Sequence, residues 1–304
     1  MQRETKNWLT LIFLACVWGS SFFLMKRGMK FPETGELIYT NLQVGALRMF
    51  IAGLVLFPFA FKFRKELLVK KRFLWISIVG LLGNFFPAFL FTYAETELSS
   101  GYAGMLNSFV PIFTLLLGYF IFKQKLTKIQ LIGVSIGAAG IILLMMSGAD
   151  LSNSGTWTHK GAIVLATLCY SISLNTIKYK LQGVKPLAVT SLAFGVTLIP
   201  STVLTFLFGA HTTWLMNQHA TYGFIHVFIL GCVGTALAVI VFNHLIVNST
   251  ALFASSVTYF IPIVAVLIGL FIGETITLFQ IVAMFIVLSG VYIANYYGKK
   301  KQKL

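Results

Sequence analysis

Long apolar runs separated by short polar segments occupy the chain from end to end. A run of about 18 or more apolar residues is long enough to cross the hydrocarbon layer of a bilayer as a helix. Such runs occupy residues 7–26, 42–62, 73–94, 99–122, 128–147, 161–180, 186–208, 221–243, 251–273 and 277–297. The pattern therefore predicts an all-α membrane protein with about ten transmembrane helices.

The longest polar stretch between these runs divides the chain into two halves of five helices each. We expect a first repeat at residues 1–147, an outer connecting loop at 148–160, a second repeat at 161–298 and a basic cytoplasmic tail at 299–304. Because five is an odd number, the second repeat must enter the membrane from the opposite side. The two repeats are therefore expected to be inverted.

The fourth and ninth runs support this division, because they align at an offset of 151 residues. Eight of 24 positions are identical between 99–122 and 250–273, including the pairs Pro111/Pro262 and Gly118/Gly269. Pro and Gly carry more weight here than shared apolar letters, since each has a backbone role in membrane helices. A stripe of small and polar residues recurs in both runs and favours either close helix packing or the lining of a cavity. In the fourth run the stripe is Gly104, Asn107, Ser108, Pro111, Thr114 and Gly118.

Composition agrees with lipid as the outer solvent. Of the 304 residues, 58% are hydrophobic and only 10% are charged, whereas soluble domains carry roughly a quarter charged residues. The net charge of +15 does not indicate nucleic-acid binding, because the basic residues lie in short connectors and not on a polar face.

The distribution of basic residues predicts the orientation of the chain. With both termini cytoplasmic, 18 of the 23 Lys and Arg residues fall in inside segments, four fall in outside segments, and Arg48 lies within a run. Positive residues in short loops favour the cytoplasmic side. We therefore expect a multi-pass protein of the cell (inner or plasma) membrane with both termini in the cytoplasm.

Several chemistries are not indicated. The three cysteines, Cys16, Cys169 and Cys232, lie within apolar runs and do not form a disulfide pattern. The histidines lack metal-ligand spacing, and no Gly-rich phosphate loop is present, so we expect no metal, no cofactor and no ATP-driven step. All eight carboxylates lie in loops or at run ends. This leaves facilitated diffusion, exchange, or coupling through peripheral groups such as Glu95, Glu97 or His244.

Arg48 is the basic residue that lies inside an apolar run, where a charge is costly. Two interpretations remain open. The guanidinium either reaches the outer headgroups or pairs with Glu95 or Glu97, or else it contacts a substrate or gate. Lys26 and Lys178 occupy equivalent places in the two halves and are expected to anchor the ends of their runs.

Aromatic and amide side chains inside the runs are suited to a small amphipathic solute, with ring faces against its apolar part and polar tips fixing its orientation. Each could equally pack between helices. The candidate pathway residues are Trp18, Ser20, Ser21, Arg48, Asn84, Thr92, Tyr93, Asn107, Tyr170, Asn175, Asn243 and Tyr259. Proline bends helices, and the candidate hinges are Pro87, Pro111, Pro200 and Pro262.

Several motifs carry a family resemblance over about residues 8–146 and 160–297. They are Trp18-Gly19-Ser20-Ser21-Phe22, Leu47-Arg48-Met49-Phe50, the runs centred on Pro111 and Pro262, and Gly273-Glu274 followed by Thr277, Gln280 and Gly290. In this order the chain resembles the drug/metabolite transporter superfamily, specifically its EamA-type ten-span branch. It departs from the family at Lys123-Gln124-Lys125, where an acidic residue like Glu274 is common, and at Tyr170-Ser171, which stands in place of Trp18-Gly19.

The resemblance implies transport of small metabolites, often amino acids or related compounds. We therefore expect a secondary transporter and not an enzyme, exporting a small-molecule substrate across the lipid bilayer by alternating access. The alternative is a membrane channel or receptor, or an enzyme without a recognisable catalytic motif. The sequence predicts neither the substrate nor the oligomeric state.

Overall fold

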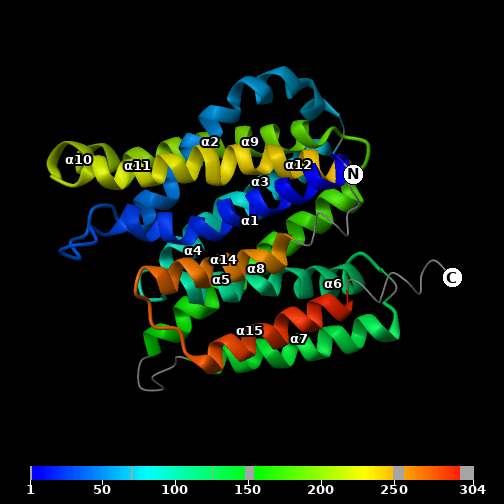
Figure 1. The fold of residues 1–304 in the computed structure, drawn as a ribbon. Helices are drawn as coiled ribbons and strands as arrows, with labels where there is room; N and C mark the ends of the chain where they lie inside the picture. Colours follow the sequence, from blue (N-terminus) through cyan, green and yellow to red (C-terminus); the bar gives the residue numbers. More distant parts are fainter. Residues whose placement is uncertain (1, 70, 125, 148–153, 249–256, 295–304) are drawn as a thin grey trace.

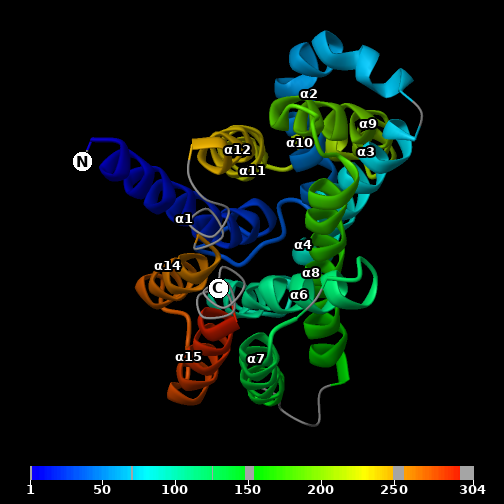
Figure 2. The same cartoon turned by 90° about the vertical axis from the view of Figure 1, so that its right-hand side faces the viewer.

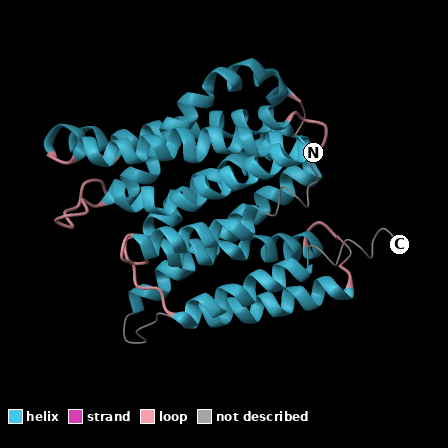
Figure 3. Ribbon diagram, in the orientation of Figure 1, coloured by secondary structure: helices cyan, strands magenta, loops and turns pink. Residues whose placement is uncertain are grey.

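The computed structural model describes residues 2–69, 71–124, 126–147, 154–248 and 257–294. In these ranges the chain is helical, without a β-strand, and a single isolated bridge joins Lys30 to Leu37 (Figure 3). Eight stretches are long and apolar enough to cross a membrane: Thr5–Met29, Asn41–Leu68, Arg72–Ala94, Ser100–Phe120, Lys128–Met146, Trp157–Lys180, Pro186–Leu207 and Ala220–Phe242.

The helices that build these stretches follow the predicted order (Figure 1). In the first half they are α1 (Gln2–Met29), α2 (Asn41–Phe63), α3 (Arg72–Gly80), α4 (Phe86–Ala94), α5 (Ser100–Leu106), α6 (Val110–Phe120) and α7 (Lys128–Met146). In the second half they are α8 (Ser154–Lys180), α9 (Pro186–Leu207), the short α10 (Ala210–Met216), α11 (Ala220–Gly231), α12 (Ala238–Asn248), α14 (Val257–Phe271) and α15 (Leu278–Tyr292).

The ninth and tenth expected spans correspond to α14 and α15, which are apolar but shorter than the other eight. Parts of the expected ranges 251–273 and 277–297 lie outside the described residues, as do residues 148–153 of the expected loop 148–160. The rest of that loop is helical, because α8 already begins at Ser154. Eight spans are therefore seen, and the count of ten stays a prediction.

Figure 1 shows α1 beginning and α15 ending at the same end of the helix bundle, the right-hand end in that view. We call this the proximal end, and the opposite end, where α1 ends and α15 begins, the distal end. In the turned view of Figure 2, α7 and α15 again lie side by side. An even number of crossings brings a chain back to the side from which it started, as seen here.

Helix contacts come in pairs related by exchange of the two halves. Helix α2 packs on α9, and α7 packs on α15, so each of these contacts joins equivalent spans. The contact of α1 with α14 has its counterpart in α8 with α6. The contacts of α3 and α4 with α8 have their counterparts in those of α11 and α12 with α1. The largest apolar core accordingly contains residues of both halves, for example Phe22, Phe109 and Val287.

The third and eighth spans share a local irregularity. A π-helical turn separates α3 from α4 at Leu81–Phe85, and another separates α11 from α12 at Cys232–Leu237. The two turns begin 151 residues apart (232 − 81), which is the offset of the fourth and ninth runs. In the second turn the Thr235 hydroxyl donates to the carbonyl of Leu230, 2.9 Å away, and satisfies a group that the turn leaves without its helical partner.

The candidate hinge prolines lie at two kinds of place. Pro87 is in the first turn of α4, directly after the π turn, and Pro111 is in the first turn of α6, directly after a 3-10 turn at Asn107–Phe109. Pro200 and Pro262 lie inside α9 and α14. Each of the first two therefore follows an existing break in a span, where the missing N–H costs least. That any of them is a hinge stays a prediction.

Glycines allow α7 and α15 to approach backbone to backbone. A Cβ placed on Gly290 of α15 would lie 2.6 Å from the carbonyl oxygen of Gly133 and would also contact the backbone N–H of Gly137. Small residues at helix crossings permit such contacts in membranes, where packing and not water drives association. Helix α15 therefore depends on Gly290 for its position.

We expect Gly290→Leu to lower the stability of the protein by about 1–3 kcal/mol, the usual cost of overpacking, because the new side chain must push α15 away from α7. Thermal unfolding in detergent measures this. Gly161→Ala is the matched control, since a Cβ on Gly161 meets nothing within 4 Å. That variant should melt at or above the wild-type temperature, and equal melting of all three proteins would contradict the packing argument.

Candidate functional site

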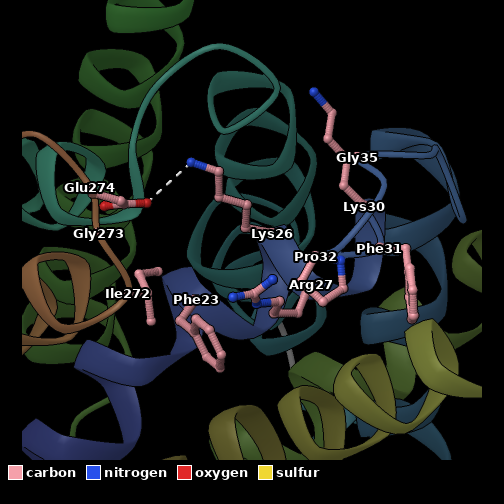
Figure 4. A pocket seen from close by; sticks show the side chains of 10 residues that line it. All are labelled: Phe23, Lys26, Arg27, Lys30, Phe31, Pro32, Gly35, Ile272, Gly273 and Glu274. Atoms are coloured by element: carbon pink, nitrogen blue, oxygen red, sulfur yellow. Dashed lines mark hydrogen bonds and ion pairs between the residues drawn. The ribbon is translucent and has the colours of Figure 1, made fainter.

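An ion pair at the distal end joins the two halves. Lys26, near the end of α1, donates from Nζ to Oε1 of Glu274 at 3.1 Å. Glu274 lies in the loop between α14 and α15, so the two partners are 248 residues apart in sequence. Figure 4 shows the two side chains pointing toward one another across the distal surface. We call this contact the distal ion pair.

Glu274 also caps the fourth span of the other half. The backbone N–H of Ser100 donates to Oε1 at 2.8 Å, and that of Gly101 donates to Oε2 at 2.9 Å. These N–H groups begin α5, where they have no helical acceptor. A carboxylate there satisfies them and also meets the positive end of the helix dipole. One side chain of the second half thus binds two elements of the first.

Two positions next to the Glu274 carboxylate require glycine, one because the carboxylate lies too close for a Cβ and the other because of its backbone conformation. A Cβ on Gly269 would lie 2.7 Å from Oε2 of Glu274. Gly273 has a φ of +84°, in the left-handed region that glycine adopts readily. Burial acts to raise the pKa of Glu274, but the N–H donors of Gly101 and Ser100, together with Lys26, hold that pKa below its ordinary value. The carboxylate is therefore ionised at neutral pH.

A second carboxylate, Glu95, lies directly after α4 and is only 1% exposed. Among the described residues, neither of its oxygens has a hydrogen-bond partner. The charged groups that act on it are Lys26, Glu274 and Arg48. Burial raises the pKa of Glu95 well above its ordinary range, and Lys26 offsets part of this effect.

Arg48 is half-buried in α2 and connects that helix to the eighth span. Its Nε donates to the hydroxyl of Thr235, 3.0 Å away in the second π turn, and its Nη1 lies 3.6 Å from the sulfur of Met25. The ion pair with Glu95 or Glu97, one of the interpretations left open for Arg48, does not form in the structure as described, although Glu95 and Tyr170 lie within electrostatic range of the guanidinium. Its partner is instead a hydroxyl group in the opposite half.

The proximal end carries a turn that resembles the one that holds Glu274 but is one residue longer. Gln124 follows α6 as Glu274 follows α14, and its N–H donates to the carbonyl of Gly118 at 2.9 Å. In the second half the N–H of Glu274 donates to Gly269 at 2.8 Å. The residue before Gln124, Lys123, has a φ of +55° in spite of its side chain, matching the positive φ of the residue before Glu274.

The side chain of Gln124 makes a neutral contact where Glu274 makes a charged one. The Tyr179 hydroxyl of α8 donates to Oε1 of Gln124 at 2.8 Å. Gln124 belongs to the first half and Tyr179 to the second, so this contact also joins the halves. Lys178, the counterpart of Lys26, lies over the ring of Tyr179 at 4.9 Å and forms no ion pair in the described chain. We call the Gln124–Tyr179 hydrogen bond the proximal contact.

The remaining candidate residues fall into three groups. Four bond to the backbone of their own helix: Ser20, Ser21, Asn84 and Thr92. Three bridge separate segments: Tyr93 to Thr158, Asn175 to the carbonyl of Thr114, and Tyr259 to the carbonyl of Val291. Two are half-buried aromatic residues in ring contacts, Trp18 with Phe242 and Tyr170 with Phe91. Asn107 is half-buried in the 3-10 turn before α6, and the side chain of Asn243 lies outside the described part of the chain.

A cavity of about 300 Å³ opens at the distal end beside the ion pair. Its wall holds three basic side chains, Lys26, Arg27 and Lys30, with Glu274 as the acidic one (Figure 4). None of the candidate pathway residues lines it. These three basic residues fall within five positions of the sequence, on the side of the membrane that is expected to be poor in positive charge. Their clustering was the signal of this site in the sequence. In the part of the chain that is described, no three His, Cys, Asp or Glu residues gather as a metal site.

The helical bundle, its paired contacts and its two matching turns define the class of a polytopic membrane protein built from a repeated unit. The EamA-like transporter family model matches residues 6–146 and again 160–296, so the chain belongs to this family. The family model matches each half once, in agreement with the similar turns at Gln124 and Glu274.

The names of similar proteins also indicate a membrane transporter. The inner membrane transporter YedA of Escherichia coli K12 is 29% identical over 94% of this chain and 89% of that protein. A protein of Salmonella typhimurium LT2 named "Probable amino-acid metabolite efflux pump" is 24% identical over 96% and 95%. A solved structure described only as "Crystal structure of protein" matches with a TM-score of 0.62 over 98% and 99% at 14% identity, which shows the fold alone. These names indicate a membrane transporter and not an enzyme.

We expect Glu274→Gln to lower stability at neutral pH by about 1–3 kcal/mol, because the amide loses the charge and turns a donor toward N–H groups. Since the pKa of this carboxyl is held below its unfolded value, its contribution is present at neutral pH. The contribution is lost as the pH falls below the ordinary Glu range of about 4. Thermal melting of wild type and variant should therefore converge in acid.

Glu66→Gln is the control for the loss of an exposed charge. Glu66 pairs with Arg72 on the surface, with a side chain that is 38% exposed. Exposed pairs contribute about 0–1 kcal/mol, so this variant should melt close to wild type at every pH. A Glu274→Gln protein as stable as the Glu66→Gln protein at pH 7 would show that the distal ion pair does not hold the halves together.

Proposed function

We propose that the protein is a secondary transporter that exports small organic metabolites, amino acids or related compounds, by alternating access between two inverted repeats. The observation that carries this proposal is the pair of equivalent contacts between the halves, one at each end of the bundle. Similar turns present Glu274 to α1 and α5 at the distal end, and Gln124 to α8 at the proximal end.

Alternating access requires a contact that closes one end while the other end opens. Contacts formed by equivalent turns of two inverted repeats satisfy this requirement. When the two halves exchange their conformations, the end that was closed opens and the end that was open closes. At the distal end an ion pair and two N–H donors join the halves. The proximal contact is a single neutral hydrogen bond, so we infer that the distal-closed conformation is the more stable one.

The orientation rests on the charge distribution. If the basic loops are cytoplasmic, the proximal end, where α1 begins and α15 ends, faces the cytoplasm and the distal end faces outward. A resting protein closed at the outside loads its solute from the cytoplasm, which is the direction of export. The relative named an amino-acid metabolite efflux pump supports the same direction.

The side chains between the two contacts suit a small solute with a carboxylate and an apolar part. Arg48 uses Nε for Thr235 and retains N–H groups in the fork geometry that binds carboxylates. The aromatic rings of Tyr170 and Phe91, stacked with centroids 5.9 Å apart, offer an apolar surface near it. These features are typical of a site for amino acids or related acids.

The proposal is tested by counterflow in proteoliposomes. Vesicles loaded with an unlabelled amino acid should accumulate the same labelled amino acid only when the protein is present. A panel of amino acids and related acids would find the substrate. Absence of counterflow with every member of the panel would refute amino-acid transport by this protein.

Gln124→Glu should slow this exchange. The new carboxylate would stand at the proximal end as Glu274 stands at the distal end, with Lys178 in the place of Lys26. A partly exposed ion pair contributes about 0.5–1 kcal/mol, so opening of the proximal end should become about two- to five-fold slower. The measurement is the initial rate of counterflow at fixed protein content.

Gln182→Glu adds the same charge to an exposed position near the same end, where Gln182 bonds only to the carbonyl of Lys178. Its exchange rate should equal that of wild type. If Gln124→Glu and Gln182→Glu have the same rate, the proximal contact does not govern opening.

A further inference from the structure

Glu95 is a carboxyl group that the packing of the helices buries without giving it a partner. Its neighbour along the chain, Thr96, does bond, to the carbonyl of Tyr93 and to His159. The Glu95 oxygens are nevertheless without a hydrogen bond to any described residue. A buried carboxylate in this condition costs far more free energy as an ion than as a neutral acid, because water cannot solvate its charge.

The elements packed around Glu95 bring both signs of charge toward it. Lys26 approaches from α1 and Arg48 from α2, while Glu274 approaches from the loop after α14. Tyr170 of α8 lies near Arg48. Each cation already has a better partner: Lys26 is bonded to Glu274, and Arg48 is bonded to Thr235. Neither cation therefore compensates an ionised Glu95 in the conformation shown.

Lys26 is the group that could change partners. It lies within electrostatic range of both carboxylates and is bonded to only one. With Glu95 neutral, Lys26 is attracted to Glu274 alone, and the distal end stays closed. With Glu95 ionised, a second anion competes for the same ammonium group, which weakens the distal ion pair. The charge of Glu95 and the closure of the distal end are thus linked through one lysine.

We propose that Glu95 is the proton-binding site of the transporter, and that binding of the proton closes the distal end whereas its loss allows the distal end to open. This inference rests on the proposed transport function and adds a coupling ion to it. A proton from the solution at the distal end binds a carboxylate oxygen of Glu95, which releases Lys26 to Glu274. When the proximal end is open, the proton leaves to that side, and the solute binds.

The balance of this cycle is one proton inward for each solute outward, with no other bond made or broken. An inward proton gradient would then drive export. Glu274 cannot serve in place of Glu95, because its own donors keep it ionised. Arg48 cannot serve either, because a guanidinium does not release its proton at the pH of cells.

Infrared spectroscopy of the purified protein in lipid tests the protonation directly, without a substrate. The C=O stretch of a protonated carboxylic acid should be present at pH 7, absent from Glu95→Gln and unchanged in Glu33→Gln. Glu33 is an exposed carboxylate at the same end of the protein and serves as the matched control. Absence of this band from wild type at pH 7, or its persistence in Glu95→Gln, would overturn the proposal.

Coupling is tested with the labelled amino acid that gives counterflow. In proteoliposomes carrying a pH gradient, wild type should move that amino acid against its own gradient. Glu95→Gln should lose this movement by at least ten-fold, because its neutral side chain keeps the distal end closed, whereas Glu33→Gln should retain it. Gradient-driven movement by Glu95→Gln at the wild-type rate would refute coupling through Glu95. If no amino acid shows counterflow, the proposed function fails, while the infrared result still decides whether Glu95 holds a proton.

Discussion

The structure follows from one constraint: inside hydrocarbon, each polar group must find its partner within the protein. Helices satisfy the backbone, and most polar side chains return to it. Thr92 bonds to carbonyls of its own helix, and Asn175 bonds to its own helix and to the neighbouring one. The N-terminal N–H groups of α7 and α15 are met by Thr127 and Thr277, each in a reciprocal pair with a glutamine three residues on. Among the described residues, a few buried hydroxyl groups also lack a partner, but Glu95 is the buried acidic side chain that does so.

The same constraint places charge where the halves meet. Glu274 is tolerated at a largely buried site because three donors converge on it, two of them N–H groups that the start of α5 cannot satisfy itself. The corresponding turn in the first half has no such charge, since Gln124 stands there and a tyrosine hydroxyl is sufficient for it. Two similar backbone turns therefore carry different electrostatics. The similarity is a property of the backbone, whereas the difference in charge arises from single side chains.

Much of the fold could be predicted from the sequence, because span length and apolar content are set by the membrane. The fifth run was expected at 128–147, and α7 is Lys128–Met146. The π turns could not be predicted, since a one-residue irregularity leaves no mark in a uniformly apolar run. Nor could the partner of Arg48, because Thr235 is 187 residues away and becomes a neighbour only when the eighth span packs on α2. The departure at Gln124 was visible in the sequence, but its meaning required the matching turn in the structure.

The two closing contacts differ in how they respond to salt. The side chain of Lys26 is 36% exposed, so ions in the medium at the distal end screen its attraction to Glu274. A neutral hydrogen bond such as that of Tyr179 to Gln124 is nearly indifferent to ionic strength. Concentrated salt therefore weakens one end of the protein and leaves the other unchanged. Ionic strength thus acts on the junction between the halves at one end alone, through a single lysine at the surface.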